Sequence, residues 1–211
     1  MNSRAERTRA ALRDAALTAF AQRGIRATTL EDVAARANVT RGAVYWHFAD
    51  KAALVREVFN DLAWPLDIGT NMDAYWLCEN PMQLLRQVLW LRMRNCIEDV
   101  RQHSMITLLL RQGGTGDVSY DLAGRFEIMT ALSVQRLETV IDICYQRGGS
   151  RPGLTPLQVA ECIHATGLGV LAEKPGRLPD PYGSSFFLPL DLVLLGASLA
   201  GDGLGIETYR L

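Results

Sequence analysis

Apolar residues recur at the three- and four-residue spacing of a helix along most of the chain. Glycine, proline and asparagine interrupt this spacing at intervals, and no stretch alternates apolar and polar residues as a half-buried strand would. The pattern predicts an all-α protein of about nine helices. The expected helices lie at residues 3–23, two short ones within 29–48, 51–64, a short one within 65–79, 81–101, 104–112, 117–147, 155–173 and 188–200. Asp50 is expected to cap the helix that follows it, and Thr155 with Gln158 has capping-box spacing at the start of the helix at 155–173. A glycine-rich break is expected at 113–116.

Residues 29–48 predict two short helices joined by a tight turn. Thr28 stands three residues before Glu31, which is the spacing of a capping box at a helix start. Asn38 occupies the expected turn, and asparagine tolerates the left-handed conformation better than most residues. The buried face of the first helix is expected to consist of Leu30, Val33, Ala34 and Ala37.

The second short helix has a narrow buried stripe and an unusual outer surface. Thr40 is expected to cap it, and Val44 with Phe48 supplies the buried stripe. A cation, two aromatic rings and two very small residues on the other side suit a helix that lies in the major groove of DNA. Its outward residues are Arg41, Gly42, Ala43, Tyr45, Trp46 and His47.

Other classes of function remain as alternatives at this point. The same two helices could belong to a helical protein-interaction module that binds no DNA and packs its aromatic rings on another domain. An enzyme is not expected, because the chain has no nucleophile elbow, glycine-rich phosphate loop or metal-binding pair of residues. No cofactor or metal ion is expected either.

Two runs of sequence resemble the TetR family of bacterial repressors, and most closely its AcrR-like branch. They are N-V-T-R-G-A-V-Y-W-H-F at 38–48, followed by Asp50 and Lys51, and T-R-A-A-L-R-D-A-A-L-T-A-F-A-Q-R-G at 8–24. The likeness is strong to about residue 62 and looser afterwards. The chain departs from the family at Asn38, where glycine is common, and at Ala49, where lysine is common.

This resemblance implies a function and a division into domains. Residues 1–50 would form a three-helix DNA-binding domain with a helix-turn-helix motif, and residues 51–211 a larger helical domain for ligand binding and dimerisation. The expected protein is a repressor that binds a palindromic operator in double-stranded DNA as a homodimer. A small hydrophobic effector would release it, and the AcrR-like branch suggests control of a multidrug efflux operon.

The expected DNA contacts fall into two groups. Arg41 and the backbone at Gly42 and Ala43 would meet base edges. The side chains expected to hold phosphates are Thr28, Thr29, Tyr45, His47 and Lys51, and Trp46 would contact a base, a phosphate or a sugar. The full expected set is Thr28, Thr29, Thr40, Arg41, Gly42, Ala43, Tyr45, Trp46, His47 and Lys51. The row of arginines on the exposed side of the helix at 3–23 would either contact the DNA backbone or form a solvated face.

Two further surfaces are expected in the second domain. The helices at 155–173 and 188–200 combine small residues with an unusually apolar surface, which is typical of a dimer interface, although an ordinary pair of core helices has the same pattern. Aromatic and soft side chains on the central helices are candidates for the effector pocket or for plain core. They are Trp76, Trp90, Met93, Met105, Phe126, Met129 and Cys144.

Charge and cysteine usage support this interpretation. The net charge of the chain is −1, but residues 1–51 carry nine Lys+Arg and five Asp+Glu, a net charge of +4, whereas the other 160 residues carry −5. A basic front part is expected where only that part meets phosphates. The four cysteines are expected to be free thiols. Because the start has no apolar run of signal-peptide type and no apolar stretch is long enough for a membrane span, a cytoplasmic protein is expected.

Overall fold

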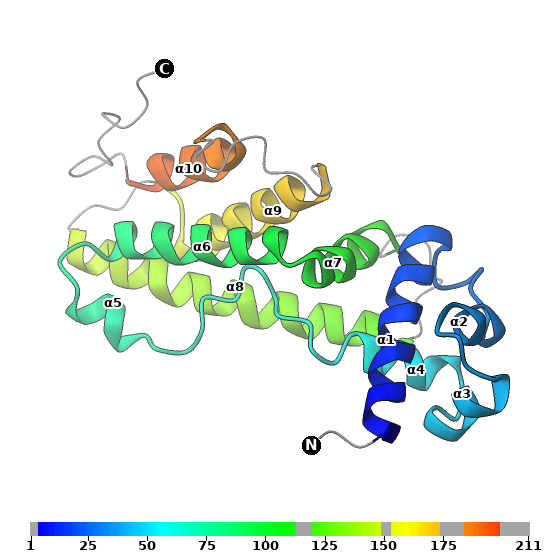
Figure 1. Ribbon diagram of the computed structural model, residues 1–211. Coiled ribbons are helices and arrows are strands. Elements are labelled where there is room, and N and C mark those ends of the chain that lie inside the picture. The colour runs from blue at the N-terminus through cyan, green and yellow to red at the C-terminus, as the bar shows by residue number, and fades with distance from the viewer. Residues whose placement is uncertain (1–3, 113–119, 149–152, 174–183, 199–211) are drawn as a thin grey trace. The chain divides into compact units, whose positions relative to one another are not determined.

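The structure is a computed structural model that describes residues 4–112, 120–148, 153–173 and 184–198 of the 211-residue chain. These residues form ten helices and no strand (Figure 1), which confirms the all-α prediction. None of the helices found there has both the length and the apolar character that crossing a membrane would need. The helices are α1 (Arg4–Arg23), α2 (Leu30–Arg36), α3 (Arg41–His47), α4 (Lys51–Val58), α5 (Asp73–Leu77), α6 (Pro81–Glu98), α7 (Val100–Gln112), α8 (Tyr120–Gly148), α9 (Pro156–Glu173) and α10 (Ser184–Ser198).

The chain forms two compact units. Unit 1 consists of Met1–Ala63 and Val100–Glu127, and unit 2 of Trp64–Asp99 and Ile128–Leu211. The functional boundary between residues 50 and 51 stays a prediction, because compactness does not test which residues bind DNA or a ligand.

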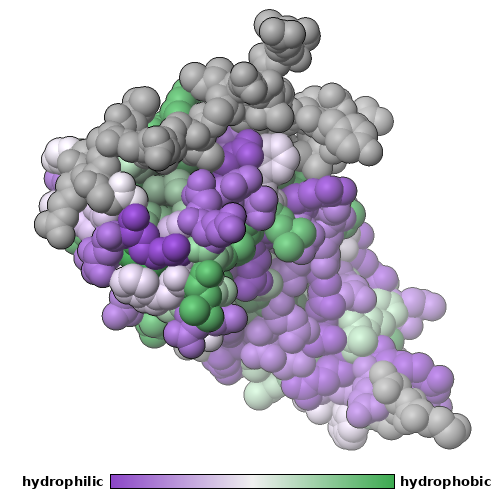
Figure 2. All heavy atoms as spheres, turned by 90° about the vertical axis from the view of Figure 1, so that its left-hand side faces the viewer, coloured by the Kyte–Doolittle hydropathy of each residue, from purple (hydrophilic) through white to green (hydrophobic). Residues whose placement is uncertain are grey.

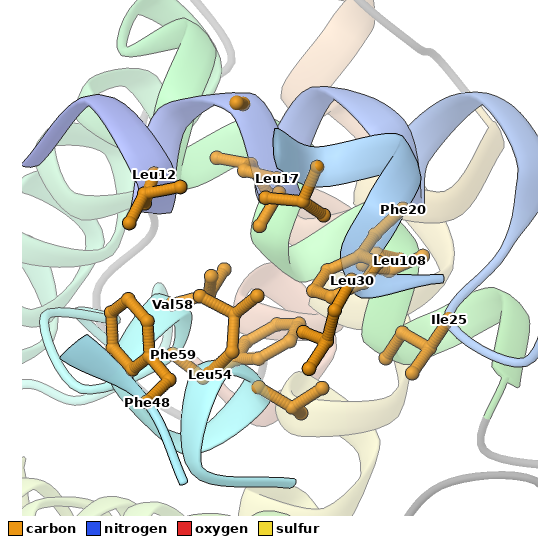
Figure 3. Packing of buried hydrophobic residues seen from close by; sticks show 14 of the residues in the cluster. Leu12, Leu17, Phe20, Ile25, Leu30, Phe48, Leu54, Val58, Phe59 and Leu108 are labelled. Carbon is orange, nitrogen blue, oxygen red and sulfur yellow. The ribbon is translucent and has the colours of Figure 1, made fainter. Parts of the chain in front are cut away.

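The core of unit 1 forms where α1 packs against α2, α4 and α7. Phe20 and Phe59 are among its largest fully buried side chains, and Figure 3 shows both rings between aliphatic side chains from these helices. Burying a large apolar side chain stabilises a fold by about 1.5–3 kcal/mol, so this cluster fixes how α2 and α3 are presented. The residues labelled in Figure 3 are Leu12, Leu17, Phe20, Ile25, Leu30, Phe48, Leu54, Val58, Phe59 and Leu108.

Local signals end and start the helices of unit 1. Gly24, at φ +83°, ends α1, and its N–H donates to the carbonyl of Phe20 at 2.8 Å. The carboxylate of Asp50 caps α4 by accepting a hydrogen bond from the N–H of Ala53 at 2.7 Å, as predicted. α4 ends at Val58, however, and not near residue 64 as its apolar pattern suggested.

Unit 2 contains α5, α6, the second part of α8, α9 and α10. α10 packs against α9 and α6, so helices far apart in sequence lie side by side (Figure 1). Thr155 and Gln158 form the capping box predicted at the start of α9, with N···O distances of 3.2 and 2.8 Å. On the face drawn in Figure 2, apolar side chains emerge between polar ones.

Some predicted boundaries differ from the structure. The helix expected at 81–101 is α6 and ends at Glu98, and α7 begins at Val100, four residues earlier than the helix expected at 104–112. The glycine-rich break expected at 113–116, the helix start expected at 117 and the end of the last helix at 199–200 lie outside the described residues.

Gly167 is expected to tolerate no larger residue, because α9 approaches Leu66 closely there. A Cβ at Gly167 would lie 2.5 Å from Cδ2 of Leu66, a side chain with no exposed surface into which to move. Gly167→Ala should therefore lower the free energy of unfolding by about 1–3 kcal/mol, the range for overpacking a core. Gly124 in α8 is the matched control, because a Cβ there meets nothing within 4 Å.

Urea unfolding at one protein concentration measures both variants. Gly124→Ala should leave the protein unchanged or stabilise it by up to about 1 kcal/mol, because alanine favours helix. Equal effects of the two substitutions would contradict the close approach at Gly167.

Candidate nucleic-acid interface

α2 begins with a capping box one residue later than the sequence suggested. The hydroxyl of Thr29 accepts a hydrogen bond from the N–H of Asp32 at 3.1 Å, and the Asp32 carboxylate accepts one from the N–H of Thr29 at 2.9 Å. The backbone and side-chain hydrogen bonds from Thr29 lower the pKa of Asp32. The expected pair of Thr28 and Glu31 is therefore wrong as a capping box.

Thr28 is also misplaced for the phosphate contact that was expected of it. Its side chain is buried, with 1 % of its surface exposed, and its hydroxyl donates to the carbonyl of Gly24 at 2.8 Å. A buried hydroxyl that already has an acceptor closes the end of α1 and does not reach a phosphate. Thr29 is exposed and stays a candidate.

The turn and the start of α3 follow the sequence closely. Asn38 has φ +54°, the left-handed conformation predicted for the turn. Thr40 caps α3, because its hydroxyl accepts a hydrogen bond from the N–H of Ala43 at 3.2 Å. Val44 and Phe48 are buried in the core of unit 1, so the opposite side of α3 faces outward.

The outer side of α3 carries the two aromatic rings that the pattern placed there. Tyr45 is 45 % exposed and Trp46 is 73 % exposed. Gly42 is exposed as well, and a Cβ at that position would meet only the hydroxyl of Thr40, at 3.9 Å. Another molecule can therefore approach the backbone of Gly42 closely, at a position flanked in sequence by Arg41 and by the rings of Tyr45 and Trp46.

Arg41 is held in place at the start of α3 by two neighbours. Its Nε lies 2.8 Å from Oε1 of Glu31 in α2, and its Nη2 donates to the Tyr45 hydroxyl at 3.4 Å. The guanidinium carbon lies 5.4 Å from the centre of the Tyr45 ring. The hydrogen bond with Tyr45 and the charge of Glu31 raise the pKa of Arg41, so it is a permanent cation.

His47 and Trp46 form an edge-to-face pair at the end of α3, with ring centres 4.6 Å apart. Burial, and then the charge of Arg9, lower the pKa of His47 below its ordinary value of about 6.5. His47 is therefore mostly neutral at pH 7. As a neutral ring it can donate one hydrogen bond to a phosphate oxygen but adds no positive charge.

Lys51 stands at the first position of α4 and is half-buried. Its Nζ donates to the carbonyl of Arg26 at 2.9 Å. Burial lowers the pKa of this ammonium group. An ammonium group has three N–H donors, so the bond to Arg26 leaves it able to bind an anion at the helix start.

An open groove of about 840 Å³ follows one edge of α3. Three of its residues come from the first turns of α1, which the sequence left undecided between a solvated face and a backbone contact. The signal for them was the row of arginines at the start of the chain. The groove is lined by Arg4, Ala5, Thr8, Asn38, Val39, Thr40, Ala43, Trp46 and His47.

The seven residues expected around an effector do not share one environment. Met105 belongs to the buried cluster of unit 1 and Phe126 packs against it, so both serve as core there. Trp76 is exposed on α5, Met93 and Cys144 are buried, and Met129 is partly buried. Trp90 lines a shallow pocket of about 240 Å³ with Arg86, Gln87, Leu91 and Arg94. The other predicted members of the pocket stay untested.

Two of the four cysteines, Cys96 and Cys144, are buried. The four cysteines are free thiols, and burial raises the pKa of Cys96 and Cys144 to about 12, which leaves them unreactive. Within the ranges that the structure describes, no three His, Cys, Asp or Glu residues are grouped to hold a metal ion.

Comparisons with known proteins match this geometry. The family model "Bacterial regulatory proteins, tetR family" matches residues 12–58, which include α2, α3 and α4. The "Probable acrEF/envCD operon repressor" of Escherichia coli (strain K12) is 31 % identical over 142 residues, or 67 % of this chain. The match spans 64 % of that repressor, slightly less than two thirds of its length.

Two solved structures share the fold over most of their length. NalD, the secondary repressor of the MexAB-OprM multidrug efflux pump in Pseudomonas aeruginosa, is 26 % identical with a TM-score of 0.68. The match covers 90 % of this chain and 96 % of NalD. SmeT, the repressor of the Stenotrophomonas maltophilia multidrug efflux pump SmeDEF, has been solved in complex with triclosan. In that structure SmeT is 28 % identical to this chain with a TM-score of 0.67, and the match covers 89 % of this chain and 90 % of SmeT.

Proposed function

The chain belongs to the tetR family of bacterial regulatory proteins, and from this premise we propose that it is a transcriptional repressor that binds operator DNA. The observation that carries the proposal is the outer side of α3. Tyr45 and Trp46 are exposed there beside Arg41, on a capped helix whose other side is buried. No catalytic role is proposed, since the relatives are transcriptional regulators.

The side chains of α3 divide into base contacts and phosphate contacts. Arg41 can donate to guanine, and the open backbone at Gly42 and Ala43 lets α3 come close to the base edges. Six other residues of unit 1 bind phosphates and sugars, and these contacts fix the position of α3 along the DNA. They are Thr29, Thr40, Tyr45, Trp46, His47 and Lys51. The groove beside α3 accommodates the sugar-phosphate backbone, with Arg4 and Thr8 from α1 as additional contacts.

We also propose that the repressor is a homodimer joined through α9 and α10. These helices pack against each other and leave Leu157, Leu188 and Leu192 exposed, with 58 % of Leu192 accessible. A second copy would cover these leucines. Two-fold symmetry then requires a roughly palindromic operator whose half-sites are about 34–36 Å apart.

A small hydrophobic effector is proposed to release the protein from DNA. SmeT in complex with triclosan supports this proposal, because a relative of the same fold binds such a molecule. A ligand that binds better to the conformation unable to span both half-sites shifts the population away from DNA. Because NalD and SmeT are repressors of multidrug efflux pumps, control of an efflux operon is the proposed role.

Binding of the full chain to random duplex DNA over a range of salt concentrations tests the proposal. A protein that neutralises phosphates loses affinity steeply as salt rises. Lys51→Ala should reduce the slope of log K against log salt by about 1, because one cation leaves the phosphate contact. The control is Arg94→Ala, which removes an exposed cation from α6 in unit 2 and should leave the slope unchanged.

Absence of duplex binding at low salt would contradict the proposed repressor function. It would favour the alternative, a helical module that covers its aromatic rings with a protein partner.

A further inference from the structure

We infer that Glu31 is a positioning residue for Arg41: its carboxylate orients the guanidinium toward a guanine edge and thereby sets the base preference of α3. The inference rests on the proposed DNA-binding function and adds a specificity-determining residue outside α3. Glu31 itself touches no base.

The contacts of Arg41 leave its recognition edge available. Glu31 is bound to Nε at 2.8 Å, and Tyr45 receives a hydrogen bond from Nη2 at 3.4 Å while its ring lies beside the guanidinium. A guanidinium carries more N–H donors than these two contacts use. One edge of the Arg41 guanidinium is thus occupied by Glu31 and Tyr45. The remaining N–H groups of its two terminal nitrogens can form the paired hydrogen bonds that distinguish guanine.

Glu31 is suited to this role because it stands on a rigid element. It lies in the first turn of α2, where the capping box of Thr29 and Asp32 fixes the helix start. Val33, two residues later and on the opposite side of α2, is fully buried in the core of unit 1. The carboxylate therefore holds a residue of α3 from a second helix, across the turn at Asn38.

The neighbouring carboxylate cannot replace it. Asp32 binds the backbone and hydroxyl of Thr29, and its other oxygen lies 2.9 Å from Nη1 of Arg23. Glu31 and Asp32 thus serve different partners although they are adjacent in sequence.

Stability alone gives little reason for the pair of Glu31 and Arg41. Both side chains are about half exposed or more, at 49 % and 65 %, and exposed ion pairs contribute little to folding. A negative charge beside the proposed phosphate contacts also opposes binding. Because Glu31 already holds the long, flexible side chain of Arg41 in one orientation, less side-chain entropy is lost when Arg41 binds a base. This smaller entropic cost of binding offsets the repulsion.

The test compares base preference in four full-length proteins: the unchanged chain, Glu31→Gln, Arg41→Ala and the double variant. Duplexes are first enriched from a randomised library with the unchanged protein, and each base pair of the enriched duplex is then varied in turn. Fluorescence anisotropy gives the ratio of dissociation constants at each position. Glu98→Gln is the matched control, because Glu98 is an exposed carboxylate paired with Arg94 in unit 2.

Glu31→Gln should reduce discrimination about two- to fivefold at the base pair where Arg41→Ala reduces it, in line with the strength of an exposed ion pair. Other positions should be unaffected, and the double variant should discriminate no worse than Arg41→Ala. Glu98→Gln should change nothing.

Four results would overturn the inference. If Glu31→Gln strengthens binding to every duplex equally, Glu31 only repels phosphates; if it changes nothing, the pair is incidental. If Arg41→Ala leaves base preference intact, Arg41 is not the base contact, although the DNA-binding function stands. Failure of the unchanged protein to bind any duplex at low salt removes the proposed function and the inference together.

Discussion

Arg86→Met is expected to lower the free energy of unfolding by about 3 kcal/mol, the low end of the cost of leaving a buried charge without its partner. Nε and Nη2 of Arg86 in α6 donate to the two carboxylate oxygens of Asp191 in α10, at 2.7 and 3.0 Å. The Asp191 side chain is 8 % exposed, whereas Arg86 is 28 % exposed. Removing the arginine therefore leaves the more deeply buried of the two charges.

Urea unfolding followed by circular dichroism, at one protein concentration, measures this loss. The control is Arg94→Met on the same helix, where the pair with Glu98 is exposed and four residues apart. That change should cost less than about 0.5 kcal/mol. The double variant Arg86→Met with Asp191→Leu should recover much of the stability, because no buried charge remains. Equal losses for Arg86→Met and Arg94→Met would contradict the burial of the pair.

This ion pair illustrates what the sequence could not predict. The pattern identified the last helix as apolar on almost every side but gave no partner for its single carboxylate, which lies 105 residues from Arg86. The same holds for Glu31 and Arg41, which meet only because two helices turn at Asn38. Hydrophobic periodicity predicts which side of a helix is buried, but it does not predict which distant side chain contacts that side.

Helix caps and the turn at Asn38 were predicted well because they depend only on residues close together in the sequence. The caps at Thr40, Asp50 and Thr155 and the left-handed Asn38 each depend on residues within a few positions. The exception is the start of α2, where two threonines are followed by two acids. Both Thr28 with Glu31 and Thr29 with Asp32 have capping-box spacing, and packing against α1 buries the first threonine.

The candidate DNA contacts followed the same division. The outward position of Tyr45 and Trp46 came from the short buried stripe opposite them, which a single helical turn determines. The effector residues were chosen for side-chain type alone. Such residues fill cores as readily as pockets, and Met105 and Phe126 are indeed part of the packing of unit 1.

Replacing both Tyr45 and Trp46 with alanine is expected to weaken binding to every duplex about 100-fold and to leave folding almost unchanged. Loss of a large side chain from a covered interface typically costs about 1–2 kcal/mol, and two such losses add when the side chains act separately. Both rings are exposed in the free protein, so their removal should change the free energy of unfolding by less than about 0.5 kcal/mol. Anisotropy titrations with random and enriched duplexes, together with urea unfolding, measure the two effects.

Trp76→Ala is the matched control for this pair, because Trp76 is also an exposed tryptophan but belongs to α5 in unit 2. It should leave the affinity for both duplexes unchanged. The contrast separates two explanations of exposed aromatic rings at the same helix. If the double variant unfolds more easily while its affinity for DNA is intact, the rings stabilise the protein itself; if affinity falls for the enriched duplex alone, they read bases and do not hold phosphates. A loss for both duplexes with an unchanged fold agrees with α3 lying along the DNA backbone through Tyr45 and Trp46 while Arg41 selects the sequence. A small further loss of discrimination at the base pair read by Arg41 is expected as well, because Tyr45 no longer contacts the guanidinium.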